Sequence, residues 1–495
     1  MTQAKEGLIE TRSIDMIPDI ERHGTPFSQF TLWFGANIQI TAVVDGALAV
    51  VFGADALWAF VGLLIGNIFG GAVMALHSAQ GPRLGLPQMI SSRAQFGVLG
   101  AIIPLILAVV MYLGFATTST VLSGQAINLM IGVQNPLVGI VIFGSITLLI
   151  SLLGYKYIHA LGRIATITGI IGFTYLTIMA FVKFPVPSLF GIKPCELPTF
   201  LLAVALSAGW QLTFGPYVAD YSRYLPRSTS QSATFWNTFW GSVIGTQWAM
   251  TLGIIITAAS FAGYGGSFLK NQVGYLGELA GGGIIAILIY LVIITSKLTV
   301  NTLNAYGSFM SMLTITTALS GKNTASKTQR TLFIIAMLTA TVCIAIFASK
   351  DLLNLFKNFV LLILSVFTPW SSINLIDYYW ISKENIDIPA LYDPDGRYGR
   401  WNAPALVSYT AGVLVQIPFL ATAMYTGPIT KMLGGTDISW IVGLLITAAI
   451  YYPWAKRCNA APADMIYPEG TLAVEETGAA CVPNNNKNRC DRYIR

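Results

Sequence analysis

The chain has 495 residues, of which 54% are hydrophobic and only 10% are charged, and its formal net charge is +6. Soluble proteins carry about 25% charged residues, so this composition excludes a soluble enzyme. Uncharged stretches long enough to cross a hydrocarbon core of about 30 Å recur along the whole chain. We therefore predict an all-α integral membrane protein.

Residues 1–27 are polar and contain no short apolar core with a cleavage site, so they are predicted to be a cytoplasmic N-terminal segment. The polar residues 456–495 are predicted to be a cytoplasmic, disordered tail. Between them, residues 28–455 are expected to form one domain of twelve transmembrane helices. The predicted spans are approximately 28–53, 56–78, 99–131, 137–155, 160–182, 199–219, 236–263, 280–312, 331–348, 357–380, 404–426 and 437–455.

Lysine and arginine residues are concentrated at the two ends of the chain and in every second loop. Positive charge marks the cytoplasmic side of a membrane protein, so both termini are predicted to be cytoplasmic. The protein is thus expected in the cell membrane as a multi-pass protein. Because topology accounts for the net positive charge, we expect the lipid bilayer and no nucleic acid as partner, and we expect a monomer.

Two ionisable side chains lie well inside predicted spans, Asp45 in the first and Lys297 near the middle of the eighth. A charge in hydrocarbon is costly, so such a residue snorkels, pairs structurally or belongs to a cation or proton pathway. Lys297 is too deep to snorkel easily, which favours a functional role. Asp45 lies nearer the outer end of its span, and there the structural interpretation is favoured.

Spans one and six share a glycine followed by an apolar-Gln-apolar-Thr string, at residues 35–41 and 209–213. Transporters with inverted repeats break two helices at the bilayer midplane, one in each half, and glycine or proline inside a span indicates such a break. Small and polar residues also serve ordinary helix packing in membranes, so coincidence is the alternative.

Span eight carries five uncharged polar residues within ten positions: Thr295, Ser296, Thr299, Asn301 and Asn304. Thr295 and Thr299 share a helix face, as do Ser296 and Thr299, and their hydroxyls are oxygen ligands of the kind that hard cations such as sodium prefer. Polar contacts between helices are the alternative for any one of these residues. The whole cluster beside Lys297 favours a binding site.

Three aromatic residues accompany these features: Trp210 and Phe214, one turn apart in span six, and Phe115 among small residues in span three. A flat heterocycle binds by stacking on aromatic rings, worth roughly 1–3 kcal/mol per base, while amide side chains bind its edges. Core packing is the alternative for each ring. Their position beside glycines and buried amides favours a stacking site.

The chain resembles the nucleobase:cation symporter-1 family, in particular its purine-cytosine permease branch, over roughly residues 20–455. The stretches that carry the resemblance are Trp33-Phe34-Gly35-Ala36-Asn37, Leu84-Gly85-Leu86-Pro87-Gln88-Met89 with Ser92-Arg93 and Phe96-Gly97, Asp220-Tyr221-Ser222-Arg223-Tyr224-Leu225-Pro226, the Asn-rich part of span eight, and Asp377-Tyr378-Tyr379. The resemblance implies a LeuT-type fold. This fold has five plus five inverted helices, here about 28–182 and 199–380, and two extra C-terminal helices at about 404–455.

The resemblance also implies that the substrate lies between spans one, three, six and eight. Its heterocycle would stack between an aromatic residue on span three, here Phe115 where many relatives have Trp, and one on span six, here Trp210 or, in a shifted alignment, Phe214. Amides and hydroxyls would bind its edges. The implied substrate-binding residues are Phe115, Ser119, Gly209, Trp210, Gln211, Phe214, Asn301, Asn304 and Gln39.

Sodium-coupled members of the family hold the ion between span-one carbonyls and span-eight hydroxyls. These positions correspond here to Gly35, Ala36 and Ile38 with Ser296 and Thr299. Lys297 departs from a simple sodium site, because its ammonium could substitute for the metal ion. Coupling to Na+, coupling to H+ and uncoupled exchange all remain open.

The sequence thus predicts a secondary active transporter, without a cofactor, that imports a nucleobase such as cytosine, hypoxanthine or adenine with Na+ or H+. Alternatives are another heterocycle (allantoin, hydantoin, uracil, or a thiamine- or pyridoxine-like vitamin), and a passive channel or transporter-like sensor. An intramembrane enzyme would need a nucleophile with a base, or a metal cluster, inside the spans. Only His77 and His159 come near a span, both at predicted cytoplasmic ends, so no enzyme is expected.

Overall fold

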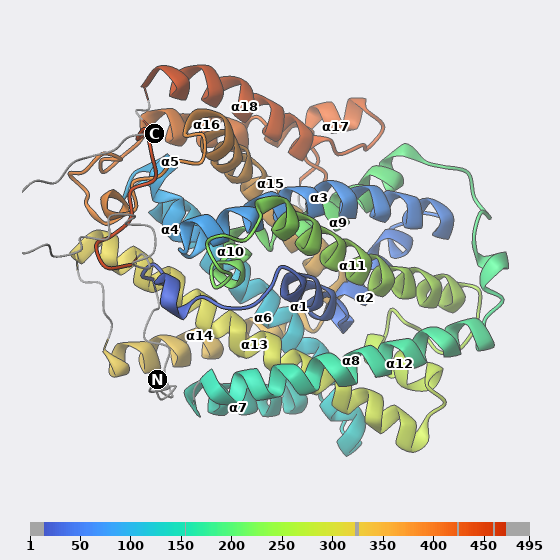
Figure 1. Ribbon diagram of the computed structural model, residues 1–495. Helices are drawn as coiled ribbons and strands as arrows, with labels where there is room; N and C mark the ends of the chain where they lie inside the picture. Colours follow the sequence, from blue (N-terminus) through green and yellow to red (C-terminus); the bar gives the residue numbers. More distant parts are fainter. Residues whose placement is uncertain (1–13, 154, 322–325, 423–424, 459–460, 472–495) are drawn as a thin grey trace, which may run out of the picture.

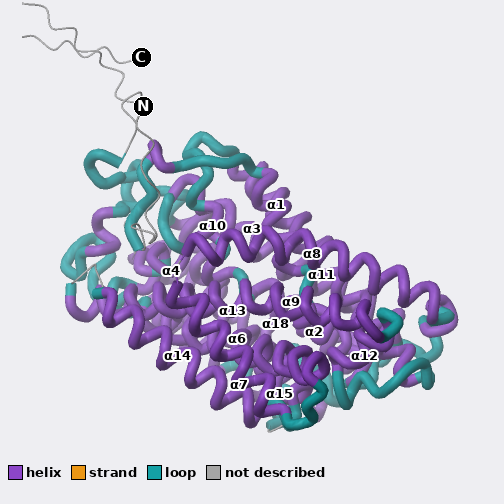
Figure 2. Tube along the Cα trace, turned by 90° about the horizontal axis from the view of Figure 1, so that it is seen from below, coloured by secondary structure: helices purple, strands orange, loops and turns teal. Residues whose placement is uncertain are grey.

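The computed structural model describes residues 14–153, 155–321, 326–422, 425–458 and 461–471. These residues form a bundle of helices, with only two isolated β-bridges among them. Figure 1 shows α16 and α18 along one edge of the bundle and α7 and α8 along the opposite edge. Figure 2 shows the helices running side by side, with loops gathered at the two ends of the bundle.

Among the described residues, eight helices are long and apolar enough to cross a membrane, or nine spans when one bent pair is counted. The eight are α3 (Ala56–Leu84), α6 (Ile102–Ile131), α8 (Tyr155–Lys183), α9 (Leu197–Leu212) counted with the turn that follows it to Tyr217, α11 (Gln231–Phe261), α13 (Gly283–Ser320), α14 (Lys327–Ala348) and α15 (Leu352–Leu375). At the three other predicted spans lie α7 (Pro136–Leu153), α16 (Ala403–Leu414) and α18 (Ser439–Cys458). The first two are shorter apolar helices, so the number twelve stays a prediction.

The first span is broken, as its sequence predicts. Helix α1 (Phe27–Asn37) and helix α2 (Ile40–Val51) meet at an angle of 62°. The break falls at Ile38 and Gln39, whose backbone is non-helical, and not at the glycine of the string. Gly35 instead permits close packing, because a Cβ there would lie 2.7 Å from the side chain of Thr166 on α8.

The sixth span is interrupted as well. Helix α9 ends at Leu212, and the 3₁₀ turn η3 (Gly215–Tyr217) and the short helix α10 (Ala219–Ser222) follow. Pro216 in this turn has no backbone N–H and cannot continue a helix ladder. The interruption therefore lies a few residues after Trp210, which itself remains helical.

Short elements connect the spans. They are η1 (Asp19–Glu21), α4 (Gln88–Ser91), α5 (Arg93–Phe96), η2 (Val186–Leu189), α12 (Gln272–Leu279), the π-helical turn η4 (Ile376–Ile381), η5 (Pro389–Tyr392), η6 (Ile417–Phe419) and α17 (Pro428–Met432). Arg93 is buried and donates to the carbonyl oxygens of Leu391 at 3.1 Å and Thr314 at 2.8 Å, which ties α5 to two distant segments.

The prediction that the tail is disordered from residue 456 is wrong for residues 461–471. Ile466 forms a β-bridge with Asp387, and the carbonyl of Thr471 accepts a hydrogen bond from the backbone N–H of Asp19 at 3.0 Å. Ile14 and Ile17 at the other end of the chain are buried too. The two ends pack together because each carries a few apolar side chains that a composition-based reading overlooks.

The core of the bundle surrounds the broken first span. Helix α11 packs against α1, α2 and α3, while α9 packs against α2, α3 and α15. On the other side, α6 packs extensively against α13. The break between α1 and α2 consequently lies close to the spans that the sequence predicts to hold the substrate.

Candidate functional site

Aromatic rings from four spans form a continuous cluster next to the break. The rings of Phe115 on α6 and Trp210 on α9 meet edge to face, with centroids 5.8 Å apart. Trp210 contacts Phe214 at 5.9 Å, and Phe214 contacts Trp33 of α1 at 5.2 Å. Phe359 of α15 lies 5.1 Å from Phe115. The structure thus brings the three predicted aromatic residues together, and Trp210 is only 1% exposed.

The indole of Trp210 is fixed by the end of α1. Its Nε1 donates a hydrogen bond of 2.7 Å to Oδ1 of Asn37, the last residue of that helix. Asn37 in turn donates to the carbonyl of Trp33 at 2.7 Å and to Oγ of Ser242 at 3.1 Å. Asn37 was not among the predicted site residues, although an amide inside a span is a sufficient signal for a buried hydrogen-bond role.

Gln211, predicted to bind the substrate, belongs to the same hydrogen-bond network through Ser242. Its Nε2 donates to Oδ1 of Asn67 on α3 and to Oγ1 of Thr246 on α11, both at 3.1 Å, and its Oε1 accepts from Ser242 at 2.6 Å. We call Asn37, Asn67, Gln211, Ser242 and Thr246 the amide network. Its side-chain amides and hydroxyls all have partners, and both N–H groups of Gln211 are used within the protein.

Two other residues were predicted to bind the substrate: Gly209 serves helix packing, and Ser119 lies within α6. A Cβ on Gly209 would lie 2.9 Å from the side chain of Val360, so a glycine there lets α9 approach α15. Ser119 is buried on α6, one turn after Phe115.

Asn301 and Asn304 lie on the face of α13 that packs on α6. Asn301 Nδ2 donates to Thr120 Oγ1 at 3.0 Å and to the carbonyl of Ala116 at 3.2 Å, but its Oδ1 has no partner. Asn304 is 7% exposed, and its Nδ2 has no partner either. One turn further along α13, a Cβ on Gly307 would touch the ring of Tyr112 on α6. Asn304 therefore lies at the level of the α6 turn that carries Phe115.

The same face of α13 reaches the break of the first span through Lys297. Its side chain is 0% exposed, and its Nζ donates to Oε1 of Gln39 at 2.6 Å and to Oγ1 of Thr41. Gln39 is the extended residue of the break and Thr41 lies in the first turn of α2. The ammonium thus bridges the break with two neutral oxygen ligands.

The remaining residues predicted for a cation lie on α1, at the break and on α13. Gly35 faces α8, as described above, and a Cβ on Gly169 of α8 would lie 3.7 Å from the carbonyl oxygen of Ile38. Ala36 and Ser296 are half-buried. The hydroxyl of Thr299 donates to the carbonyl of Thr295 at 3.1 Å, within its own helix. Oxygen atoms of spans one and eight are thus available as ligands. Among the described residues around the break, however, the cationic group is the side chain of Lys297.

Asp45 contradicts the interpretation made from its sequence position. It lies in α2, one turn after Thr41, and its side chain is 0% exposed. Neither carboxylate oxygen accepts a hydrogen bond from a described residue. The residue neither snorkels nor pairs structurally, so the structural interpretation is wrong. Its depth inside the bundle could not be read from its distance to the end of a predicted span.

His77 likewise lies inside the bundle and not at its surface. It is 0% exposed on α3, stacks on Trp370 at 4.7 Å and contacts Ser371 Oγ at 3.2 Å. The side chain of His159 lies outside the described residues. In the part of the chain that the structure describes, no three histidine, cysteine or acidic residues are grouped as a metal ion would require.

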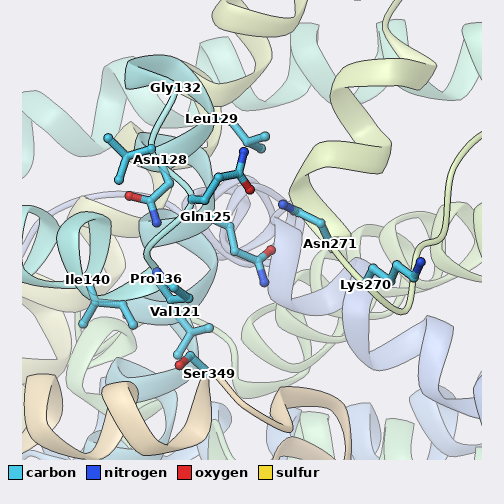
Figure 3. A pocket seen from close by; sticks show the side chains of 12 residues that line it. Val121, Gln125, Asn128, Leu129, Gly132, Pro136, Ile140, Lys270, Asn271 and Ser349 are labelled. Carbon is cyan, nitrogen blue, oxygen red and sulfur yellow. The ribbon is translucent and has the colours of Figure 1, made fainter.

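A cavity of about 320 Å³ lies away from the aromatic cluster, where α6 ends and α7 begins. Figure 3 shows Gln125 and Asn128 of α6 and Asn271 around it. Gln125 also receives a hydrogen bond from the backbone of Val273 and donates one of 3.0 Å to Gln272. Helix α12 is thereby fastened to α6 beside this cavity.

Comparison with known proteins identifies the family. A family described as permeases for cytosine/purines, uracil, thiamine and allantoin matches residues 16–443. The chain belongs to this family. It is therefore a permease of the nucleobase:cation symporter-1 type and a multi-pass membrane protein, and the family is one of transporters and not of enzymes.

This permease is similar to a putative purine-cytosine permease, YxlA, of Bacillus subtilis (strain 168). The two are 36% identical over 449 residues, which cover 90% of this chain and 96% of the relative. The purine-cytosine permease fcyB of Emericella nidulans is 24% identical, with 90% and 88% covered.

Solved structures share the fold. Mhp1, a nucleobase-cation-symport-1 family transporter in a closed conformation with bromovinylhydantoin bound, superimposes with a TM-score of 0.72 at 18% identity, covering 94% of this chain and 98% of that one. Its inward-facing conformation gives 0.71 at 19% identity, covering 92% and 95%. The likeness shows an all-α membrane transporter fold.

Proposed function

We propose that this permease is a secondary active transporter that imports a nucleobase, cytosine or a purine such as hypoxanthine or adenine, with Na+ or H+. Both termini would lie in the cytoplasm, in keeping with the positively charged inner loops. The transporter would alternate between outward-open and inward-open states around one site between α1, α6, α9 and α13.

The unpaired amide atoms on α13 carry the proposal. Asn301 Oδ1 and Asn304 Nδ2 are buried without partners, and residues three apart on a helix are neighbours. A buried polar atom left unpaired costs about 1–3 kcal/mol, so a free acceptor beside a free donor favours a ligand that satisfies both. Nucleobases carry such adjoining donors and acceptors on their edges.

The aromatic cluster supports a flat ligand. Phe115 and Trp210 lie on opposite helices at the level of these amides, and base stacking on one ring is worth roughly 1–3 kcal/mol. In this structure the two rings touch edge to face with centroids 5.8 Å apart. A base would enter between them only when α9 and α6 separate or a ring rotates, as alternating access requires.

The relatives support this substrate class and widen the list of compounds to test. Two similar proteins are named purine-cytosine permeases, one of them putative, and the family description also names uracil, thiamine and allantoin. Uptake of radiolabelled cytosine, hypoxanthine, uracil, allantoin and thiamine into proteoliposomes, with Na+ and H+ gradients imposed separately, tests the proposal. Accumulation of a base under either gradient supports it. Accumulation of thiamine alone would assign a vitamin substrate, and equilibration without accumulation would indicate a passive channel.

The Trp210→Ala variant tests whether the predicted site is the one used. We expect it to abolish saturable binding of the transported base, since it removes a stacking surface and one wall of the site. Isothermal titration of the purified variant measures this. Trp236→Ala is the matched control, because Trp236 is 50% exposed on α11 and away from the cluster. Unchanged base binding by Trp210→Ala would contradict the assigned site.

A further inference from the structure

Asp45 is a buried ionisable group that the proposed substrate site does not use. Its side chain is 0% exposed and both carboxylate oxygens lack a donor. An ionised carboxylate without a partner is strongly disfavoured in a protein interior, and more so in a membrane. The neutral acid avoids most of this cost. An acidic residue kept in such a place is therefore a candidate for a group that binds and releases a proton.

The helix faces of α2 place Asp45 toward the interior of the bundle. Gly46 and Val43 lie on the side of α2 that packs against α11. A Cβ on Gly46 would meet the backbone of Met250, and the carbonyl of Val43 contacts Gly253. Residues four apart share a face, so Thr41 and Asp45 lie together on the side away from α11. With a rise of about 1.5 Å per residue, Asp45 is about 6 Å beyond Thr41 along the helix.

Two lysines lie along this face of α2. Lys297 donates to Thr41 on one side of Asp45. On the other side, Nζ of Lys357 on α15 lies 3.7 Å from the ring centre of Phe52, which follows Asp45 by about 10 Å along the helix. Lys297 is thus the nearer described positive charge, roughly one turn away.

No further ionisable group on the helices packed against α2 faces Asp45. Helices α9 and α11 contain none. On α3, Asn67 contacts Met250 and therefore lies at the level of Gly46, next to Asp45. The ionisable residues of α3 are more distant: His77 lies ten residues and about 15 Å further along the helix, and Arg83 lies beyond it. On α6, Tyr112 packs on Tyr217 in the aromatic cluster.

The surroundings of Asp45 suit a proton better than a metal ion. Apart from Thr41, one turn earlier, its neighbours on α2 are apolar or glycine, and neither carboxylate oxygen has a hydrogen-bond partner among the described residues. A hard cation needs several oxygen ligands, whereas a proton needs only one carboxylate oxygen. This distinguishes Asp45 from the oxygen atoms around the break of the first span.

We propose that Asp45 is the proton-binding site that couples uptake of the base to a proton gradient, an inference that rests on the proposed transport function. In each cycle one proton from the outer solution binds to a carboxylate oxygen, giving the neutral acid. After the change of access, that proton leaves to cytoplasmic water, and the carboxylate is regenerated. Na+ takes no part in the cycle.

The experiment uses the full chain in proteoliposomes with a pH-sensitive dye inside. Three quantities are measured with radiolabelled cytosine or whichever base the wild type carries: counterflow without any gradient, accumulation under a proton or a sodium gradient, and acidification of the lumen on adding base outside. With one proton per base, we expect the accumulation ratio at equilibrium to rise about tenfold per unit of imposed pH difference. A sodium gradient should add nothing.

The variant Asp45→Asn removes the proton site and keeps the shape of the neutral acid. We expect counterflow within about twofold of wild type, since the uncharged site still changes access, while the accumulation ratio falls to about one and base-driven acidification disappears. Glu196→Gln is the matched control, because Glu196 is exposed at the start of α9, and it should behave as wild type. Asp45→Glu retains a carboxyl group and should retain acidification with an altered pH dependence.

The outcomes separate this inference from the proposed function. If the wild type shows no counterflow of any base, the proposed function fails. If it accumulates base under a sodium gradient and moves no protons, the inference alone is overturned, and this needs no variant. Asp45→Asn with unchanged proton-driven accumulation also overturns it. Should Asp45→Asn fail to fold, Asp45→Glu decides: counterflow without acidification overturns the inference, and acidification with a shifted pH profile supports it.

Discussion

Two polar regions flank the aromatic cluster, and they differ in how completely their atoms are bonded. The amide network joins α1, α3, α9 and α11, and its side-chain donors and acceptors are paired. By contrast, Asp45 of α2 and Asn301 and Asn304 of α13 keep buried polar atoms without partners. We call Asn301 and Asn304, which share one face of α13, the open polar face. Both regions consist of residue types that are rare inside membranes, so composition alone does not separate them.

The difference assigns a role to each region. A saturated hydrogen-bond network holds helices at a fixed distance, because every rearrangement would break a bond in a medium that offers no replacement. Unpaired buried atoms are costly and persist where a ligand or a proton satisfies them during function. We therefore interpret the amide network as the fixed wall of the site and the open polar face as its working surface.

The largest effect on stability is expected for Gln211→Leu in the amide network. The substitution removes three hydrogen bonds, and since such bonds between membrane helices average about 0.6 kcal/mol, the free energy of unfolding should fall by about 2 kcal/mol. Thermal unfolding in detergent measures it. Gln29→Leu is the matched control, because Gln29 of α1 is buried and its Oε1 has no partner. An equal loss of thermal stability in Gln211→Leu and Gln29→Leu would contradict a stabilising role specific to the amide network.

The converse is expected for Asn304→Ala on the open polar face. Its Nδ2 has no partner within the protein, so thermal stability should stay close to wild type. The lost bond to the base should weaken binding about tenfold to a hundredfold, the equivalent of about 1–3 kcal/mol. Equilibrium binding of the transported base by the purified variant measures this. A fall in stability with unchanged affinity would make Asn304 a member of the structural wall instead.

The smallest effect on stability is expected for Asp55, whose carboxylate, unlike that of Asp45, accepts hydrogen bonds within the protein. Asp55 caps α3 and accepts four backbone hydrogen bonds, from Leu57, Gly191, Ile192 and Lys193. Burial by itself raises the pKa of Asp55, but the four N–H groups outweigh it and leave the pKa below its ordinary value. The carboxylate thus stabilises the fold above the unfolded pKa of about 3.9, and the contribution is lost as the pH falls through the lower folded value.

Asp55→Asn tests this at a site outside the spans. We expect a loss of about 1 kcal/mol at neutral pH, because Asn has only one acceptor oxygen and cannot accept all four N–H groups, and no loss at a pH below the folded pKa. Thermal unfolding of both proteins across the acidic range measures the difference. A constant difference over the whole range would show that the charge of Asp55 does not contribute.

Much of the architecture could be predicted from the sequence. The apolar runs located the long helices, since a span must satisfy its own backbone and therefore be a helix of sufficient length. The paired strings in spans one and six located both breaks to within a few residues, although Gly35 and Gly209 turned out to be positions of close helix packing. Phe115, Trp210 and Phe214, predicted as stacking residues for the substrate, lie in one aromatic cluster, and their role in binding stays a prediction.

The sequence by itself determined the membrane class, the helical fold and the residue types of the site, because hydrocarbon tolerates few alternatives. Only the tertiary structure decided which amides are bonded to one another and which are free. Gln211 and Asn304 are equivalent in sequence, each an amide inside a span, yet one is saturated by α3 and α11 and the other faces α6 unpaired. The same holds for Asp45, whose isolation depends on which helix faces surround α2, and hydrogen-bond partners distant in sequence leave no local trace.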